Sequence, residues 1–308
     1  MGPQRENVHV THDRRPPAGA AGRFAPSPTG PLHHGSLVAA AGSWLFARAA
    51  GGRWLVRMED LDRPRVVEGA DRQILDALRR YGLEWDGEVV YQSQRTHLYD
   101  DALRQLREKG QVFDCVCSRS ELQRAASAPA ESDPAERIYP GTCRNGLPPG
   151  RAARSVRFRG EGVIALDDLV FGHVEEDLAA TTGDFVIKRA DGVFAYQLAV
   201  VVDDEAQGVT QVVRGADLLS STARQIALQR ALGYRTPQYA HLPLVVDAAG
   251  AKIGKRNGLH GVGDESLQLA LRILGIEVDR GTPAQMLEQA LARFDVSKIP
   301  RTPSCMNN

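Results

Sequence analysis

Long apolar runs are missing from this sequence of 308 residues. No stretch of 18 or more apolar residues occurs, so we expect no membrane span. The first 22 residues also lack the apolar segment of a secretory signal. An excess of one charge sign is missing too, because Lys+Arg and Asp+Glu both total 38. A strongly basic protein is thereby excluded, and any nucleic-acid surface must be a local patch. These absences favour a cytoplasmic globular protein without membrane contact.

Cysteine is scarce, with four residues in the chain. Cys115, Cys117 and Cys143 fall within one short segment, and Cys305 lies near the C-terminus. Without a secretory signal, a disulfide framework is disfavoured and a metal site is favoured. Three thiolates and one further ligand would complete a tetrahedral structural zinc site. Three buried free thiols are the alternative.

Strand patterns and helix patterns alternate along most of the chain, which indicates a parallel α/β fold. The segment 115–155 is rich in Cys, Pro, Gly and Arg and predicts an inserted module. A hairpin is expected at 185–196. Strands are expected at 23–26, 53–58, 209–213 and 242–246, and helices at 35–50, 68–81, 98–106, 221–232, 267–275 and 283–294.

The segment RFAPSPTGPLHHGS, from Arg23 to Ser36, predicts a strand, a tight turn and the start of a helix. Backbone N–H groups and the dipole at a helix N-terminus favour a bound anion. His33 and His34 stand beside that helix start and could hydrogen-bond triphosphate oxygens. A Pro/Gly turn with incidental histidines is the alternative.

Lysine is also scarce, and two of the five lysines share the segment KIGKR. These are Lys252 and Lys255, and they follow the strand expected at 242–246. Ligands bind at the carboxyl ends of strands in α/β sheets. An ammonium there could stabilise negative charge that develops on phosphate oxygens. A basic surface loop is the alternative.

Together these two segments resemble the signatures of class I aminoacyl-tRNA synthetases. RFAPSPTG followed by HHGS resembles the His-x-Gly-His signature as glutamate enzymes carry it, with Ser36 in place of the second histidine. KIGKR resembles the Lys-Met-Ser-Lys-Ser loop, with Gly254 and Arg256 in place of the serines. The resemblance implies a Rossmann-type domain that activates L-glutamate with ATP and Mg. It implies catalytic roles for His33 and Lys255, and ATP contacts from His33, Gly35, Lys252 and Lys255.

A glutamate site needs a carboxylate for the ammonium group and an arginine for the side-chain carboxylate. Glu59 stands at the carboxyl end of the strand expected at 53–58. The segments FAYQLAVVVDD and VTQVVRG resemble the corresponding stretches of glutamate-tRNA ligases. The resemblance implies a glutamate site formed by Arg23, Phe24, Ala25, Pro26, Ser27, Glu59, Tyr196 and Arg214.

The cysteine-rich segment resembles that of one branch of this family, the short glutamyl-Q tRNA(Asp) synthetases. They carry Cys-x-Cys and then Tyr-x-x-x-Cys in this insertion, with a tyrosine oxygen as the fourth zinc ligand. The resemblance implies one structural zinc ion, held by Cys115, Cys117, Tyr139 and Cys143.

The length of the chain after the second signature bears on the nucleic-acid partner. A glutamate-tRNA ligase carries a large helical anticodon-binding part there, whereas residues 256–308 are all that follow here. The resemblance therefore implies a monomeric enzyme that transfers glutamate to the queuosine base in the anticodon of tRNA(Asp). A truncated ligase that charges tRNA(Glu) and a non-catalytic glutamate- or nucleotide-binding module are the alternatives.

The expected organisation has three parts. Residues 1–22 form a disordered extension. Residues 23–258 form the Rossmann-type parallel-sheet catalytic domain, with an insertion at about 110–180 that includes the zinc module 115–143. Residues 259–308 form a short helical C-terminal extension without an anticodon-binding domain.

Overall fold

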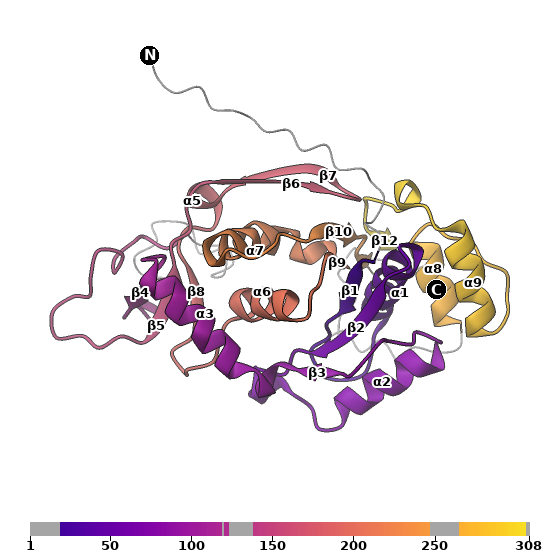
Figure 1. Cartoon of the computed structure of the whole chain (residues 1–308), viewed down its shortest axis with the longest axis horizontal. Coiled ribbons are helices and arrows are strands. Elements are labelled where there is room, and N and C mark those ends of the chain that lie inside the picture. The colour runs from indigo at the N-terminus through magenta and orange to yellow at the C-terminus, as the bar shows by residue number, and fades with distance from the viewer. Residues whose placement is uncertain (1–18, 119, 123–137, 247–264, 306–308) are drawn as a thin grey trace, which may run out of the picture.

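A five-stranded parallel sheet forms the centre of the protein (Figure 1). The computed structural model describes residues 19–118, 120–122, 138–246 and 265–305. The strand order is β10-β9-β1-β2-β3, and neighbouring strands are parallel. The order reverses at β1, and open α/β sheets bind ligands at the carboxyl ends of strands beside such a point. The bounds are β1 Ala21–Phe24, β2 Arg53–Met58, β3 Val90–Tyr91, β9 Gln211–Gly215 and β10 Gln238–Leu242.

Helix α1, His34–Ala49, is apolar on all sides and is therefore buried. It packs on β1 and β9 and on the helices α8, Ser266–Ile273, and α9, Pro283–Arg293. Gly42 permits a close approach to β10, because a Cβ there would lie 2.5 Å from Cδ1 of Leu242. The C-terminal segment is helical as expected, and its helices belong to the same hydrophobic core as α1.

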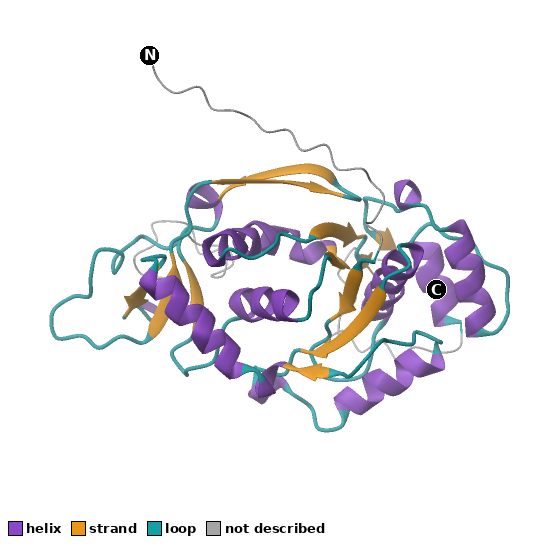
Figure 2. Ribbon diagram, in the orientation of Figure 1, coloured by secondary structure: helices purple, strands orange, loops and turns teal. Residues whose placement is uncertain are grey.

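Helices beside the central sheet, seen in Figure 2, contribute to a second hydrophobic core. Apolar side chains of α3, Thr96–Glu108, and α6, Tyr196–Ala206, meet there with those of α7, Leu219–Leu232. Helix α2, Ala70–Arg80, contributes its apolar face to the first core through Ile74 and Leu78. The short 3-10 turns are η1 Arg63–Arg65, η2 Gln92–Gln94, η3 Ala216–Leu218 and η5 Val296–Lys298.

The segment between α3 and α6 forms antiparallel structure, which agrees with an inserted module. Three strands, β4 Val112–Cys115, β5 Ser155–Phe158 and β8 Phe185–Lys188, form one sheet. A long hairpin of β6, Val163–Asp168, and β7, Gly172–Asp177, leads into the short helix α5, Leu178–Thr181. Strand β6 packs against α7 and β10, so the hairpin returns to the central sheet (Figure 1).

Three sequence-based expectations need correction. Strand β1 begins at Ala21, inside the expected extension. The expected strand 242–246 is in fact β10, which ends at Leu242, and a separate β11, Val245–Val246, which pairs with β12, Ser304–Cys305. Pro243 explains the break, because proline has no N–H to donate to a ladder.

The expected hairpin at 185–196 is also incomplete. Within the expected hairpin, Lys188 of β8 pairs with Phe194 through a single bridge. Helix α6 then starts at Tyr196. The apolar run after Tyr196 is a buried helix, which short-range periodicity does not distinguish from a strand. No helix in the described part of the chain is both long and apolar enough to cross a membrane.

Candidate active site

A cavity of about 580 Å³ opens at the carboxyl ends of β1, β2 and β9. The start of α1 and the start of α6 complete its walls. Lys252 and Lys255 lie outside the described residues. Ten residues expected from the sequence line the cavity: Arg23, Phe24, Ala25, Pro26, Ser27, His33, Gly35, Glu59, Tyr196 and Arg214.

The two signature histidines have different surroundings. His33 is the N-cap of α1, and its Nδ1 accepts from the backbone N of Ser36 at 3.3 Å. Its Nε2 lies 2.9 Å from Oγ of Ser36, so this serine contacts the first histidine of the signature. His34 does not line the cavity and instead lies 3.2 Å from Oγ of Ser266. The expectation that both imidazoles face one anion is therefore wrong for His34.

Arg214 is the penultimate residue of β9 and is 4% exposed. It donates five hydrogen bonds, and every acceptor is neutral. Among the described residues it has no carboxylate partner. A buried guanidinium without a counterion favours an anionic ligand.

The contacts of Arg214 differ between its two sides. Contacts to residues outside the cavity lining include 2.7 Å to Oε1 of Gln225 and 2.8 Å to Oγ1 of Thr222. The contacts to two cavity-lining residues are longer, 3.3 Å to the hydroxyl of Tyr196 and 3.4 Å to the carbonyl oxygen of Leu218. A ligand carboxylate could therefore replace the weaker contacts while the stronger ones keep the guanidinium in place.

Glu59 follows β2, and its side chain is 11% exposed. Its Oε1 is buried, has no hydrogen-bond partner among the described residues and lies 3.9 Å from Nη2 of Arg57. Burial raises the pKa of Glu59 to about 7, although Arg57 and Arg23 oppose the shift. Glu59 lines the cavity, and its carboxylate could accept from the ammonium group of a ligand.

Asp204 of α6 contacts two arginines, Arg23 and Arg57. It accepts from Nε of Arg23 at 3.1 Å and from Nη2 of Arg57 at 2.6 Å. Burial raises the pKa of Asp204, but Arg23 and Arg57 outweigh it and lower that pKa overall. Arg23 and Arg57 thus share a carboxylate partner inside the protein, whereas Arg214 has none among the described residues.

Sequence reasoning missed several charged residues of the cavity wall. Asp62, Arg65 and Arg189 line it, and Asp62 joins them with contacts of 2.6 Å to Arg65 and 3.3 Å to Arg189. Asp62 and Arg65 follow β2 just as Glu59 does, so the strand end was a usable signal for them. Arg189 comes from a distant turn, and no pattern in the sequence marks it.

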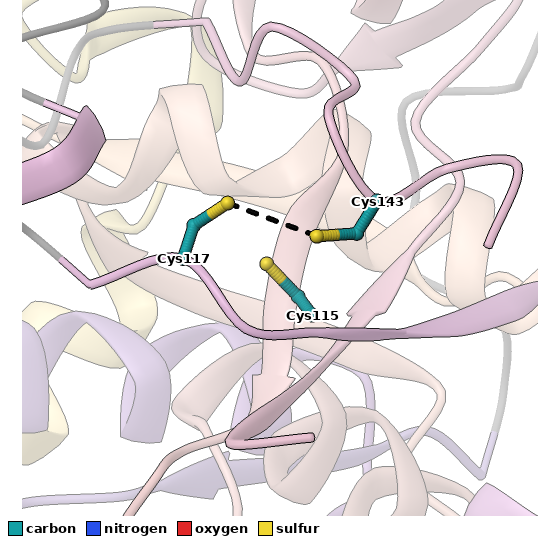
Figure 3. Close-up of side chains that lie close together, drawn as sticks. All are labelled: Cys115, Cys117 and Cys143. Atoms are coloured by element: carbon teal, nitrogen blue, oxygen red, sulfur yellow. Dashed lines mark hydrogen bonds between the residues drawn. The ribbon is translucent and has the colours of Figure 1, made fainter. Parts of the chain in front are cut away.

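The sulfur atoms of Cys115, Cys117 and Cys143 point toward one another (Figure 3). They lie within 4.8 Å of one another, and Sγ of Cys117 is 3.7 Å from Sγ of Cys143. The hydroxyl of Tyr139 is 3.5 Å from Sγ of Cys115 and 3.6 Å from Sγ of Cys117. A tetrahedral metal with bonds of about 2.3 Å separates its sulfur ligands by about 3.8 Å. The four side chains therefore fit around one metal ion.

Arg157 supports this cluster from outside. Its Nε donates to Sγ of Cys115 at 3.4 Å, and its guanidinium carbon lies 3.9 Å from the ring centre of Tyr139. Burial raises the pKa of Cys115, but hydrogen bonds from Tyr139 and Arg157 outweigh it and bring that pKa to about 7. A nearby cation offsets the negative charge of several thiolates, as outer-shell groups do at metal sites.

Known proteins share the fold and much of the sequence of this chain. The family described as tRNA synthetases class I (E and Q), catalytic domain, matches residues 21–278. A glutamate-tRNA synthetase from Elizabethkingia anophelis superposes with a TM-score of 0.79 at 25% identity, over 94% of this chain and 68% of that one. A glutamate tRNA ligase from Elizabethkingia meningosepticum, solved in complex with its amino acid, gives 0.78 at 25%, over 94% of this chain and 67% of that one.

Two curated relatives are more similar in sequence. The glutamyl-Q tRNA(Asp) synthetase of Geobacter sulfurreducens is 54% identical, over 91% of this chain and 93% of that protein. The glutamyl-Q tRNA(Asp) synthetase of Thiobacillus denitrificans is 51% identical, over 93% of this chain and 97% of that protein. The chain therefore belongs to the class I tRNA synthetase family for E and Q, in the branch formed by the glutamyl-Q tRNA(Asp) synthetases.

Proposed function

We propose that the cavity binds L-glutamate and activates it with ATP. The observation that carries this proposal is a buried guanidinium, without a carboxylate partner in the described part of the chain, in the same cavity as a carboxylate, Arg214 and Glu59. Among the described residues Arg214 has only neutral partners, and Glu59 lines the same cavity. Arg214 would bind the side-chain carboxylate of glutamate, and Glu59 would bind its ammonium group. The α-carboxylate is then left free to react.

The residues of the first signature would hold ATP beside this amino acid. His33 caps α1, and Gly35 lines the same cavity, so the positive end of the helix dipole is available to phosphate oxygens. An oxygen of the α-carboxylate attacks the α-phosphorus, a new P–O bond forms, and pyrophosphate leaves. Lys252 and Lys255 are proposed to bind ATP with Mg and to stabilise the charge on the leaving pyrophosphate. The chain's main contribution is to position the two substrates.

The proposed acceptor is a hydroxyl of the queuosine base in the anticodon of tRNA(Asp). Relatives more than 50% identical over nine-tenths of this chain are named for that activity, which supports the proposal. The hydroxyl attacks the activated carbonyl carbon, an ester forms, and AMP leaves. We propose a monomer that acts in the cytoplasm.

We also propose that the cysteine cluster holds one structural zinc ion. Cys115, Cys117, Tyr139 and Cys143 would be its ligands, and four protein ligands leave no open position for catalysis. The ion would fix the cysteine-rich part of the inserted module, where the hydrophobic cluster is small. The cluster core includes Phe113 and Val116 in addition to three of the four ligands.

A transfer assay tests the acceptor. Labelled glutamate and ATP are incubated with tRNA(Asp) that carries either queuosine or unmodified guanosine at the wobble position, and with tRNA(Glu). We expect label only in the queuosine pool, and it should remain after the 3′-terminal nucleoside is removed. Equal labelling of both tRNA(Asp) pools, or label at the 3′ end of tRNA(Glu), would replace this proposal with a truncated ligase. If no glutamate-dependent ATP–pyrophosphate exchange is detected, the alternative of a non-catalytic glutamate- or nucleotide-binding module is supported.

A further inference from the structure

Two buried residues outside the cavity, His241 and Asp168, form a chain of hydrogen bonds that ends at Arg214. His241 in β10 lies beside Arg214 in the parallel register of the sheet. Its Nε2 accepts from Nε of Arg214 at 3.2 Å, and its Nδ1 lies 2.7 Å from Oδ2 of Asp168. The side chains of His241 and Asp168 are both 0% exposed.

The hydrogen bonds specify one form of the imidazole. Burial and the charge of Arg214 lower the pKa of His241, although Asp168 opposes them. The imidazole is therefore neutral near pH 7. A neutral imidazole that accepts through Nε2 carries its proton on Nδ1. That proton is donated to Asp168. In the other tautomer Nε2–H could donate only to Thr222, which lies 3.2 Å away, and Nε of Arg214 would lose its acceptor.

Asp168 has a fixed orientation that selects this tautomer. Its Oδ1 accepts from the backbone N atoms of Val170 at 3.0 Å, Phe171 at 2.9 Å and His241 at 3.2 Å. Only Oδ2 is left to face Nδ1 of His241. An ionised carboxylate at that point can only accept, so the imidazole must donate through Nδ1.

We propose that Asp168 and His241 form a positioning pair that sets the selectivity of the cavity for an acidic amino acid. The imidazole of His241 is a neutral acceptor for Nε of Arg214. It also lies between Arg214 and the Asp168 carboxylate, which therefore does not contact the guanidinium. A carboxylate bonded directly to Arg214 would neutralise it, and Asp204 pairs directly with Arg23 in this way. The guanidinium is thus held in place with its charge available to a ligand carboxylate. This proposal rests on the proposed binding of glutamate.

The variant Asp168→Asn tests the positioning pair, because it replaces one carboxylate oxygen by an NH₂ group. Three backbone N–H groups require an oxygen at the Oδ1 position, so the new amide NH₂ must face Nδ1 of His241. That contact selects the Nε2–H tautomer, which opposes the N–H of Arg214. We expect the KM for glutamate to rise about tenfold or more, since a buried donor loses its acceptor. The KM for ATP and the kcat should change less than threefold.

Two substitutions at His241 separate its two hydrogen bonds. A glutamine oxygen reaches the position of Nε2, so His241→Gln keeps an acceptor for Arg214. An asparagine amide reaches only the position of Nδ1, so His241→Asn keeps the bond to Asp168 and loses that acceptor. We expect a near-normal KM for glutamate in His241→Gln and a raised one in His241→Asn. The double variant Asp168→Asn with His241→Gln should recover most of the affinity lost in Asp168→Asn.

A measurement without turnover completes the test. Nitrogen-15 NMR of labelled histidine should show the Nδ1–H tautomer for His241 in the unaltered protein and the Nε2–H tautomer in Asp168→Asn. An unchanged KM for glutamate in a folded Asp168→Asn protein, or equal losses in His241→Gln and His241→Asn, would overturn the positioning role. If the unaltered protein does not bind glutamate by calorimetry, the proposed function fails instead, and the NMR result still reports on the tautomer.

Discussion

Replacing Arg214 by alanine tests the charge on which the glutamate proposal depends. The change removes a buried guanidinium that is held by five neutral acceptors. Truncating one partner of a buried charged pair costs about 2–5 kcal/mol of binding free energy. Binding must displace the long contacts to Tyr196 and Leu218, so the lower part of this range applies. About 2–3 kcal/mol corresponds to a rise of about 30- to 150-fold in the KM for glutamate.

The assay is ATP–pyrophosphate exchange over a range of glutamate concentrations, with glutamine as a second substrate. In Arg214→Ala the preference for glutamate over glutamine should largely disappear, because only the charge of the side chain separates the two. Thr222 and Gln225 lose a donor, so the free energy of unfolding should also fall, by about 1–3 kcal/mol. Circular dichroism checks that the variant remains folded at the assay temperature.

Arg224 provides the matched control. It lies on the same helix that contacts Arg214, it is partly buried, and it does not line the cavity. In Arg224→Ala we expect the KM for glutamate to stay within about threefold of normal, since no ligand contact is removed. If Arg214→Ala keeps a normal KM and a normal preference for glutamate, Arg214 does not bind the substrate and the reasoning is refuted.

Three further predictions address the other groups. Below its pKa of about 7, Glu59 is protonated and no longer attracts an ammonium group. The KM for glutamate should therefore rise as the pH falls below 7. The variant Glu59→Gln should raise the KM and remove this pH dependence. Metal analysis should find about one zinc per chain, and Cys143→Ser should lose metal and thermal stability together, whereas a metal-free and fully stable protein would support free thiols. Lys255→Ala should slow adenylate formation more than it weakens glutamate binding, and an unchanged kcat with a raised KM would contradict a role on the leaving pyrophosphate.

Local patterns were sufficient for much of the fold. Helix α1 and strand β2 lie where the sequence placed them, because an uninterrupted apolar run and a short run rich in large apolar residues are local signals. The family followed from signature segments whose residues are close together in the chain. The position of Glu59 beside the cavity followed from its place at a strand end, since parallel strands present their carboxyl ends at one edge.

Other features depend on residues that are distant in the sequence. Local sequence could not show which arginines are paired with a carboxylate. Arg23 contacts Asp204, which lies 181 positions away, whereas the partners of Arg214 among the described residues are neutral. The contact between His241 and Asp168 spans 73 positions and needs the β6–β7 hairpin to return to the central sheet. The residue types in the chain thus determined which chemical groups the site contains. The packing of the hairpin and helices against the sheet decided which charges are neutralised and which remain available, because burial and hydrogen bonding depend on neighbours in space.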